Sequence, residues 1–583
     1  MARQIAIRSL IIKTVFSALF GVVMMMDRRI VVNISFDHLL TSNSDNYVGA
    51  TSVSSILALV ISATAVFALL TGAERLASSG WRWVFRSQVA PPSHRWFWIF
   101  TITLSLAWLP WWLSNLPGGV FYDTYAVYRI IDGTLPLSNQ QPIFYTGINA
   151  VVFWVVRSVF HGSIEIAVFT MTMLTYSFMA LSIAYFLYWL LKHGVSRVIT
   201  SIVLSYFVLL PLFSYYASSN GKDTWFSIAV FLFAIKLVDV VRTQGESLRR
   251  GRGVLHYITL AFLICWFRNN GIYVVAVTTI SLLIIYRHVL VMSYFHRRES
   301  GDRLKQSPWT LREKLPLFLA ASVVLIFGTG LLQGPVFSSI GWNKDQSVET
   351  YGIPIQQICS IIANGGRLSD ADRAVFDQIV APKVISVYFS PLGVDEVKSN
   401  MGVQAKQFLS THQGDFLRVW LSVVSNNPRQ AFYAYLLTTL GFWDPVRGHN
   451  AGYMQHGLAP GGELLGLKWY DVIHKVTGHS FNAVYAPRYF ISSALFCWLT
   501  LFMAVVLILR RKSVLLLPFA PLITLWGTIL IATPIAFGLR YVYAFVPFLA
   551  LAVILAFGSE MWLGEYSPSA DVSISRDPAT DQD

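Results

Sequence analysis

Twelve long apolar stretches constrain this chain more than any other feature of its sequence. A helix needs about 20 largely apolar residues to cross a bilayer, and backbone in lipid must satisfy its own hydrogen bonds. Only 13% of the 583 residues are charged, against roughly 25% in a soluble domain. The sequence therefore predicts an all-α polytopic membrane protein with about 12 transmembrane helices and excludes an ordinary soluble enzyme. The stretches are 9–26, 51–73, 97–115, 164–191, 198–217, 225–241, 254–267, 272–294, 315–333, 489–509, 515–533 and 537–558.

The distribution of basic residues predicts the orientation, because Lys and Arg accumulate in cytoplasmic loops. If the N-terminus is cytoplasmic and the marginal segment 142–160 does not cross, the inner connections hold 22 of the 44 Lys and Arg. If 142–160 crossed, the basic groups at 249–252 and 297–298 would face outward. We therefore expect cytoplasmic N- and C-termini and an amphipathic helix over 142–160 on the outer surface. Half of the basic residues behind the net charge of +14 then reflect topology, and no nucleic-acid partner is expected.

These assignments divide the chain into five parts. One large polar segment, 334–488, is expected outside the membrane as an α-rich extracytoplasmic domain. The others are two additional N-terminal helices (1–96), a transmembrane core (97–333) with an outer loop at 116–163, C-terminal transmembrane helices (489–558) and a disordered cytoplasmic tail (559–583).

A possible metal motif occurs in the polar segment, where Asp370 and Asp372 form a DxD pattern. Nucleotide-sugar transferases use this pattern for a metal, but nucleotide sugars are not available outside the cytoplasm. Ser369 precedes the pattern and an apolar run follows it, which is typical of a helix N-terminus. We interpret 369–372 as a helix cap.

Four outer connections, far apart in the sequence, each carry a charged residue at the same expected depth. They contain Asp123, Lys222 followed by Asp223, Arg268 followed by Asn269, and Arg540 followed by Tyr541. A charge at the lipid boundary is costly unless it has a partner or water. Each cation alone could reach lipid phosphates; three cations and a carboxylate on one face favour a common site.

This set of charges suits sugar transfer from a lipid carrier. Neither ATP nor a nucleotide sugar is available outside, so an activated substrate must be lipid-borne, and a polyprenyl-phosphate-linked sugar fits. Lys222, Arg268 and Arg540 would bind the donor phosphate, and Asp123 would act as the base on the acceptor hydroxyl. A single displacement would invert the anomeric centre.

Aromatic residues follow this loop, among them Tyr122 and Tyr145. An interfacial aromatic belt explains most of them. Stacking on a sugar ring or an isoprenoid is the alternative for Tyr122 and Tyr145.

The pattern resembles the GT-C superfamily of polytopic glycosyltransferases, which use polyprenyl-phosphate sugars and an essential acid in the first outer loop. The matching residues are LPGGVFYD at 116–123, NQQPIFY at 139–145, which includes Gln141, and the Arg540-Tyr541 pair. With GKD at 221–223, RNNG at 268–271, PIQQ at 354–357 and GFWDP at 441–445, the ordered set is similar to an uncharacterised family of bacterial multispanning proteins of this type.

The resemblance implies a GT-C bundle of seven conserved helices with juxtamembrane helices in the first outer loop. It also implies a location in the bacterial plasma membrane and an extracytoplasmic glycan or glycolipid acceptor. Many members pair two acids in this loop, whereas Thr124 follows Asp123 here. Whether the site uses a divalent metal, Mg²⁺ or Mn²⁺, therefore stays open. Asp223 either helps to hold it, pairs with Lys222 or caps the next helix.

Two other functions remain open. An O-antigen polymerase or ligase would also use outer arginines, but on a donor with a diphosphate. A membrane transporter would place charges or broken helices near the midplane, whereas these charges gather at one face.

Overall fold

The chain folds as an all-α polytopic membrane protein, with one pair of two-residue strands in the part described. The computed structural model describes residues 2–30, 48–79, 92–137, 141–287, 317–339, 346–447, 465–479, 491–532 and 535–563. The predicted disordered tail begins too early, because its first residues form the helix α32 (Ser559–Trp562). Residues from 564 onward lie outside the described ranges, as do the basic group 297–298 and Asn139 and Gln140 of the NQQPIFY motif.

Eight helical segments in the described ranges are long and apolar enough to cross a membrane, or nine if a bent pair is counted as one span. Three other helices at predicted spans have only 15 to 17 residues: α11 (Gly251–Phe267), α12 (Gly271–Ile285) and α28 (Ser493–Leu509). At 1.5 Å per residue they extend about 22–26 Å, short of a hydrocarbon core about 30 Å thick. The sequence pattern located helices at these places but not their lengths.

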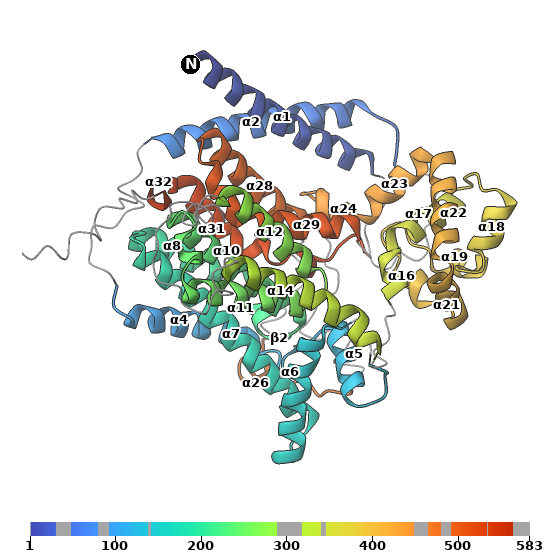
Figure 1. Cartoon of the computed structure of the whole chain (residues 1–583), viewed down its shortest axis with the longest axis horizontal. Coiled ribbons are helices and arrows are strands. Elements are labelled where there is room, and N and C mark those ends of the chain that lie inside the picture. Colours follow the sequence, from blue (N-terminus) through green and yellow to red (C-terminus); the bar gives the residue numbers. More distant parts are fainter. Residues whose placement is uncertain are drawn as a thin grey trace, which may run out of the picture.

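The long segments and the bent pair account for most of the bundle (Figure 1). They are α1 (Ala2–Arg29), α2 (Val53–Ser78), α4 (Arg95–Leu113), α7 (Ile164–Lys192), α8 (Arg197–Leu209) with α9 (Pro211–Ala217), α10 (Lys222–Arg242), α14 (Leu317–Leu331) with the π-helical 332–336, the 3₁₀ turn Ser513–Phe519 with α29 (Ala520–Ile531), and α30 (Leu539–Val542) with α31 (Phe545–Phe557).

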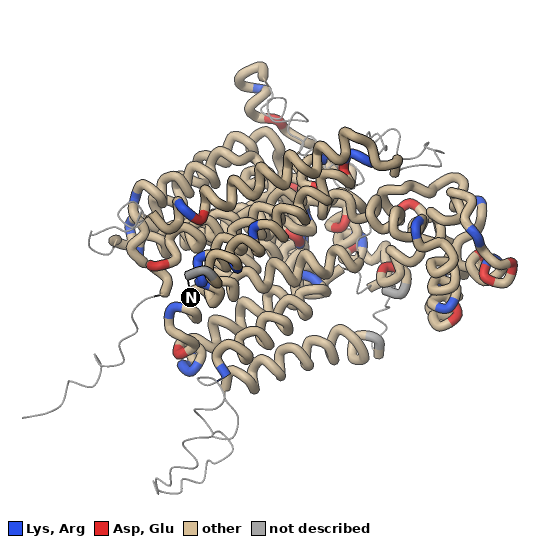
Figure 2. The backbone as a smooth tube through the Cα atoms, turned by 90° about the horizontal axis from the view of Figure 1, so that it is seen from above, with Lys and Arg blue, Asp and Glu red and all other residues tan. Residues whose placement is uncertain are grey.

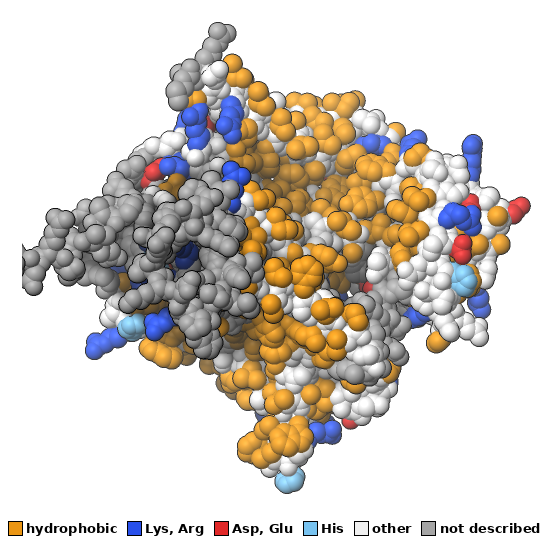
Figure 3. Space-filling model, in the orientation of Figure 1, with side chains coloured by type: hydrophobic (Ala, Val, Ile, Leu, Met, Phe, Trp, Pro, Cys, Tyr) orange, Lys and Arg blue, Asp and Glu red, His pale blue; other side chains and the backbone are white. Residues whose placement is uncertain are grey.

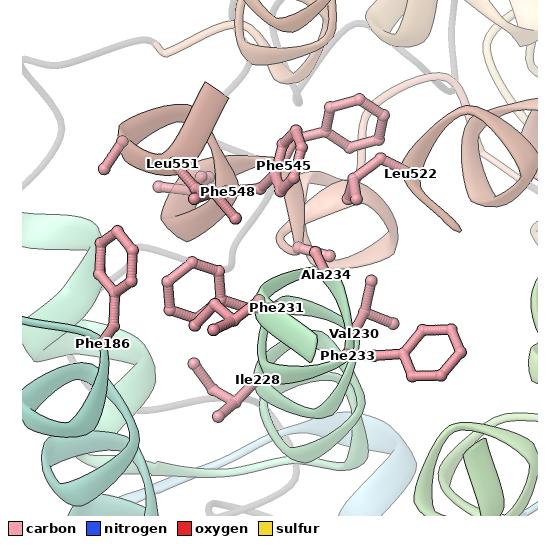
Figure 4. Packing of buried hydrophobic residues seen from close by; sticks show 14 of the residues in the cluster. Phe186, Ile228, Val230, Phe231, Phe233, Ala234, Leu522, Phe545, Phe548 and Leu551 are labelled. Atoms are coloured by element: carbon pink, nitrogen blue, oxygen red, sulfur yellow. The ribbon is translucent and has the colours of Figure 1, made fainter. Parts of the chain in front are cut away.

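The centre of the bundle is α10, which packs against α7, α11 and α31. Its most apolar 18-residue window is 83% buried, as is that of 539–557. A helix that is apolar all round can be buried on every side, and Figure 4 shows Phe231 of α10 on the side toward Phe186, with Phe233 on the opposite side of the helix. This core fixes where the first turn of α10 lies.

The α1–α2 pair lies at the edge of the bundle, where it contacts α28 (Figure 1). Its apolar windows are only 17% and 11% buried. The exposed side chains are those of Leu10, Leu19, Ile61 and Leu69, among others, as expected for lipid-facing helices.

A separate group of short helices has its own apolar core, which includes Ile355, Phe376 and Val419. Figure 2 shows charged residues along the backbone of this group. In Figure 3 charged side chains lie on its surface, whereas apolar side chains dominate the visible face of the bundle. Its helices are α16 (Gln346–Thr350), α17 (Gly352–Ala363), α18 (Asp370–Phe376), α19 (Pro382–Tyr388), α20 (Asp395–Ser399), α21 (Val403–Thr411), α22 (Gln413–Asn426) and α23 (Pro428–Thr438).

The interpretation of 369–372 as a helix cap is confirmed. Ser369 is the N-cap of α18, and its hydroxyl accepts a hydrogen bond from the backbone N–H of Asp372. The Asp372 carboxylate in turn accepts hydrogen bonds from the hydroxyls of Ser369 and Ser422.

An ion-pair network joins α1 to the loop after α24 (Leu440–Trp443). Arg447 pairs with Asp27 of α1 and donates to the backbone carbonyls of Asp27 and Ile30, at 2.9 and 3.0 Å. Its Nε also lies 3.6 Å from Oδ2 of the fully buried Asp444. Ser492 donates to the Asp444 carbonyl.

Burial and the neighbouring Asp27 raise the pKa of Asp444 to about 7. Because the carboxyl takes up a proton on folding, its contribution to stability is greatest in acid and is lost as the pH rises through about 7. We expect the thermal midpoint of the wild type in detergent to fall between about pH 4 and 7, and Asp444→Asn, which stays neutral, to flatten that fall.

Asp377→Asn is the control, because Asp377 makes a half-exposed pair with Arg373 within α18 and its following turn and such pairs contribute little. An identical pH dependence in Asp444→Asn and the wild type would contradict the assignment.

Candidate functional site

Two short parallel strands bring distant segments of the chain together. In β1 (Gly119–Val120) and β2 (Ser219–Asn220), Gly119 is paired with Ser219 and Val120 with Asn220. Glycines allow this approach. Gly118 has φ +128°, and a Cβ there would lie 2.2 Å from the Thr172 side chain; a Cβ at Gly221 would lie 2.2 Å from the Phe121 ring.

A helix follows each strand. The helix α5 (Tyr122–Ile131) begins two residues after β1, and α10 begins two residues after β2. Asp123 lies in the first turn of α5, and Lys222 is the first residue of α10. The strand pair therefore places the predicted base beside the first predicted cation.

Asp123 lies between two cations. Arg540 Nη1 donates to Asp123 Oδ2 at 2.9 Å, and Lys222 Nζ lies 3.2 Å from the same oxygen. Lys222 Nζ also donates to Gln141 Oε1 at 2.8 Å. Arg540 comes from α30, more than 400 residues along the chain.

Asp223 makes the second half of the cluster. Arg268 Nη1 lies 2.9 Å from Asp223 Oδ1, and Arg540 Nε lies 3.9 Å from Asp223 Oδ2. Of the alternatives for Asp223, pairing with Lys222 is not realised, because the side chains of these neighbours on α10 reach different partners. Asp223 lies in the first turn of α10, whose N-cap is Gly221. Arg540 thus links both carboxylates, and we call Asp123, Lys222, Asp223, Arg268 and Arg540 the charge cluster.

Tyr541 packs against both arginines of the cluster. The guanidinium carbons of Arg268 and Arg540 lie 5.1 and 4.7 Å from the centre of its ring, and Arg540 Nη2 donates to its hydroxyl at 2.9 Å. The ring of Phe226 lies 5.5 Å from Arg268. These cation–π contacts are attractive, and they restrict the side chains of the two arginines.

The charge cluster is mostly buried, with side-chain exposures between 4% for Asp223 and 25% for Asp123. Burial would raise the pKa of Asp123, but Arg540 and Lys222 outweigh it and hold the pKa well below its ordinary value. With both carboxylates and all three cations ionised, the cluster carries a net charge of +1.

Two predicted supporting residues lie elsewhere, whereas Asn269 follows Arg268 directly in the turn before α12. Tyr122 is 61% exposed, with its ring beside that of Tyr125. Tyr145 is buried, with its hydroxyl in hydrogen bonds to Thr124 and Asn220. The stacking alternative for Tyr145 is therefore wrong, because no face of its ring is open to a ligand.

A buried polar hub next to the cluster was missed by the sequence analysis. It consists of Thr124, Tyr128, Tyr145, Asn149 and Asn220, joined by hydrogen bonds of 2.7 to 3.1 Å. One signal was present: Asn149 and Asn220 are amides in or beside strongly apolar segments.

The two carboxylates do not form a metal site suited to Mg²⁺ or Mn²⁺. Every ion-pair partner recorded for Asp123 and Asp223 is a cation, and a divalent ion there would be repelled by all three. Across the part of the chain that the structure describes, no group of three or more His, Cys, Asp and Glu is arranged to hold a metal ion.

Comparison with known proteins gives one match. A model described as a family of unknown function, DUF6020, matches residues 118–296 and 310–570. No curated protein and no solved structure matches the chain significantly. The matched residues include the whole charge cluster and the polar hub, but not α1 and α2.

Proposed function

The chain belongs to DUF6020, a family of unknown function, and we propose that it is a membrane glycosyltransferase. It transfers a sugar from a polyprenyl-phosphate donor to an extracytoplasmic glycan or glycolipid, with inversion at the anomeric carbon. The observation that carries this proposal is the arrangement of three cations around two carboxylates with Arg540 linking both.

The charge of the cluster suits this donor. A sugar on a polyprenyl monophosphate is a phosphodiester with one negative charge, which balances the cluster's net charge of +1. A sugar on a diphosphate carries two charges and would leave a buried excess of negative charge. The monophosphate is therefore the better fit, and the diphosphate donor of an O-antigen polymerase or ligase the poorer one.

Donor binding activates the base in this mechanism. The phosphate competes for Lys222 and Arg540, which in the free protein hold the pKa of Asp123 low. As these cations turn to the phosphate, Asp123 becomes more basic and accepts the proton of the acceptor hydroxyl. The acceptor oxygen bonds to the anomeric carbon, the bond to the phosphate oxygen breaks, and the cations stabilise the departing polyprenyl phosphate.

The membrane placement is part of the proposal. The twelve sequence-defined segments, three of them short helices, would span the bacterial plasma membrane with both termini cytoplasmic. In Figure 1 the N-terminus and α32 (Ser559–Trp562) lie toward the opposite end of the molecule from the α16–α23 group. If the termini are inside, this group faces outward, near the acceptor. The helices α5 and α6 (Ile143–Trp154) would be the juxtamembrane helices of a GT-C bundle.

A transporter is the second candidate, because α8 and α9 are bent by 62° at Leu210–Pro211. Broken helices occur at transporter binding sites. The bend leads directly into β2 and Lys222, so it also serves to position the charge cluster.

Reconstitution separates these candidates. We expect purified protein in liposomes with a membrane-glycan extract to transfer label from at least one of a panel of undecaprenyl-monophosphate sugars. We expect no transfer from the same sugars on undecaprenyl diphosphate. Accumulation of labelled sugar inside the vesicles without a new covalent product would favour the transporter, and transfer from the diphosphates alone would favour the polymerase or ligase.

A further inference from the structure

In the polar hub beside the charge cluster, one side chain is hydrogen-bonded to three others. Asn220 is fully buried, and its side-chain amide donates to Tyr128 Oη at 2.7 Å and to Asn149 Oδ1 at 3.0 Å. Its Oδ1 accepts from Tyr145 Oη at 2.8 Å. One side chain thus joins α5, through Tyr128, to α6, through Tyr145 and Asn149.

The backbone of Asn220 adds a link to the residue after the proposed base. Its carbonyl accepts from the Thr124 hydroxyl at 2.9 Å, and Thr124 Oγ1 lies 3.1 Å from Tyr145 Oη. Thr124 is the neighbour of Asp123, and Asn220 lies two residues before Lys222. The hub therefore holds the chain on both sides of the 3.2 Å gap between Lys222 Nζ and Asp123 Oδ2.

Two cations of the cluster have further contacts outside this network, although Arg540 also pairs with Asp123. Arg268 follows α11, Arg540 lies on α30, and both pack on Tyr541. Loss of the hub would free α5 to move relative to α10 while Arg268 and Arg540 keep their contacts with Asp223 and Tyr541. Removing one member of this buried hub also leaves its partners buried without a hydrogen bond, which is costly in free energy.

We propose that Asn220, with Tyr145, is a positioning residue that holds the Asp123 carboxylate against Lys222 and so aligns the base with the donor phosphate. This inference rests on the proposed function, and it assigns the hub to the catalytic step rather than to donor binding. Misplacement of a reacting group by about 1 Å can lower a rate by roughly 10²-fold.

The test compares Asn220→Ala and Tyr145→Phe with the wild type. Tyr145→Phe removes only the hydroxyl and guards against the failure of Asn220→Ala to fold. We expect kcat to fall by about 10²-fold, the Kd for undecaprenyl phosphate to stay unchanged, and hydrogen exchange to rise at the amides of α5 but not of α10. Tyr257→Phe is the matched control, since it removes a buried hydroxyl that contacts Thr279 between α11 and α12.

Unchanged kcat and unchanged exchange in α5 would overturn the inference, as would a weaker Kd with an unaltered kcat. Equal effects in Tyr257→Phe would also overturn it, because they would show a general loss of stability. If the wild type transfers no sugar, the proposed function fails, and the exchange measurement alone then decides whether the hub holds α5.

Discussion

Asp123→Asn should abolish sugar transfer without weakening the binding of the lipid phosphate. General-base catalysis contributes about 10²–10⁴-fold to a rate, and asparagine keeps the shape of the side chain but cannot take the proton. Removal of the carboxylate raises the net charge of the cluster from +1 to +2. We therefore expect transfer to fall by about 10²–10⁴-fold, while the affinity for undecaprenyl phosphate is equal or higher. Initial transfer rates and equilibrium lipid binding measure the two effects.

Asp132→Asn is the matched control. Asp132 follows the same helix, is exposed, and pairs only loosely with the exposed Arg157, at 3.8 Å. Such pairs contribute little, so transfer should stay at the wild-type level. Wild-type rates in Asp123→Asn, or a parallel loss of lipid binding, would show that Asp123 is not the base.

Arg540 should be the most sensitive of the three cations, because it alone contacts both carboxylates. Removing one partner from a buried ion pair costs about 3–5 kcal/mol, so Arg540→Gln is paired with Arg540→Lys, which keeps the charge. Lysine cannot replace the planar two-sided contact. We expect transfer to fall by about 10²–10³-fold in both variants, with lipid binding weakened more in Arg540→Gln.

The pH profile gives a second readout for Arg540. Arg540 is the main cation that lowers the pKa of Asp123. Without it that pKa rises, so Asp123 loses its ionised form at a higher pH. The acid limb of kcat/KM should therefore move upward in pH in Arg540→Gln and stay in place in the control Arg157→Gln. A limb that does not move would contradict the contact between Arg540 and the base.

Much of the site could be expected from the sequence, because topology alone brings charged residues at outer helix ends to one depth. On that ground the sequence places Asp123, Lys222, Arg268 and Arg540 together. The fold brings Asp123 into contact with Lys222 and Arg540, and Arg268 joins them through Asp223. Which carboxylate meets which cation could not be expected. The pairing depends on side-chain direction at the first turn of α10, where Lys222 points to Asp123 and its neighbour Asp223 to Arg268.

The sequence pattern also does not predict the helix lengths or the polar hub. Apolar composition locates α11, α12 and α28 but does not decide where each helix ends. The hub requires that β1 and β2 pair, and two-residue strands leave no periodic signal. Asn220 looks like an ordinary turn residue until Tyr128, Tyr145 and Asn149 are seen around it.

In the proposed mechanism, three cations hold the phosphate of a polyprenyl lipid. An experimental structure of the protein in nanodiscs with undecaprenyl phosphate tests it most directly. We expect phosphate density in contact with Lys222, Arg268 and Arg540, with the Asp123 carboxylate released from at least one of its present partners. Phosphate density away from these residues, with the ion pairs of the charge cluster unchanged, would contradict it.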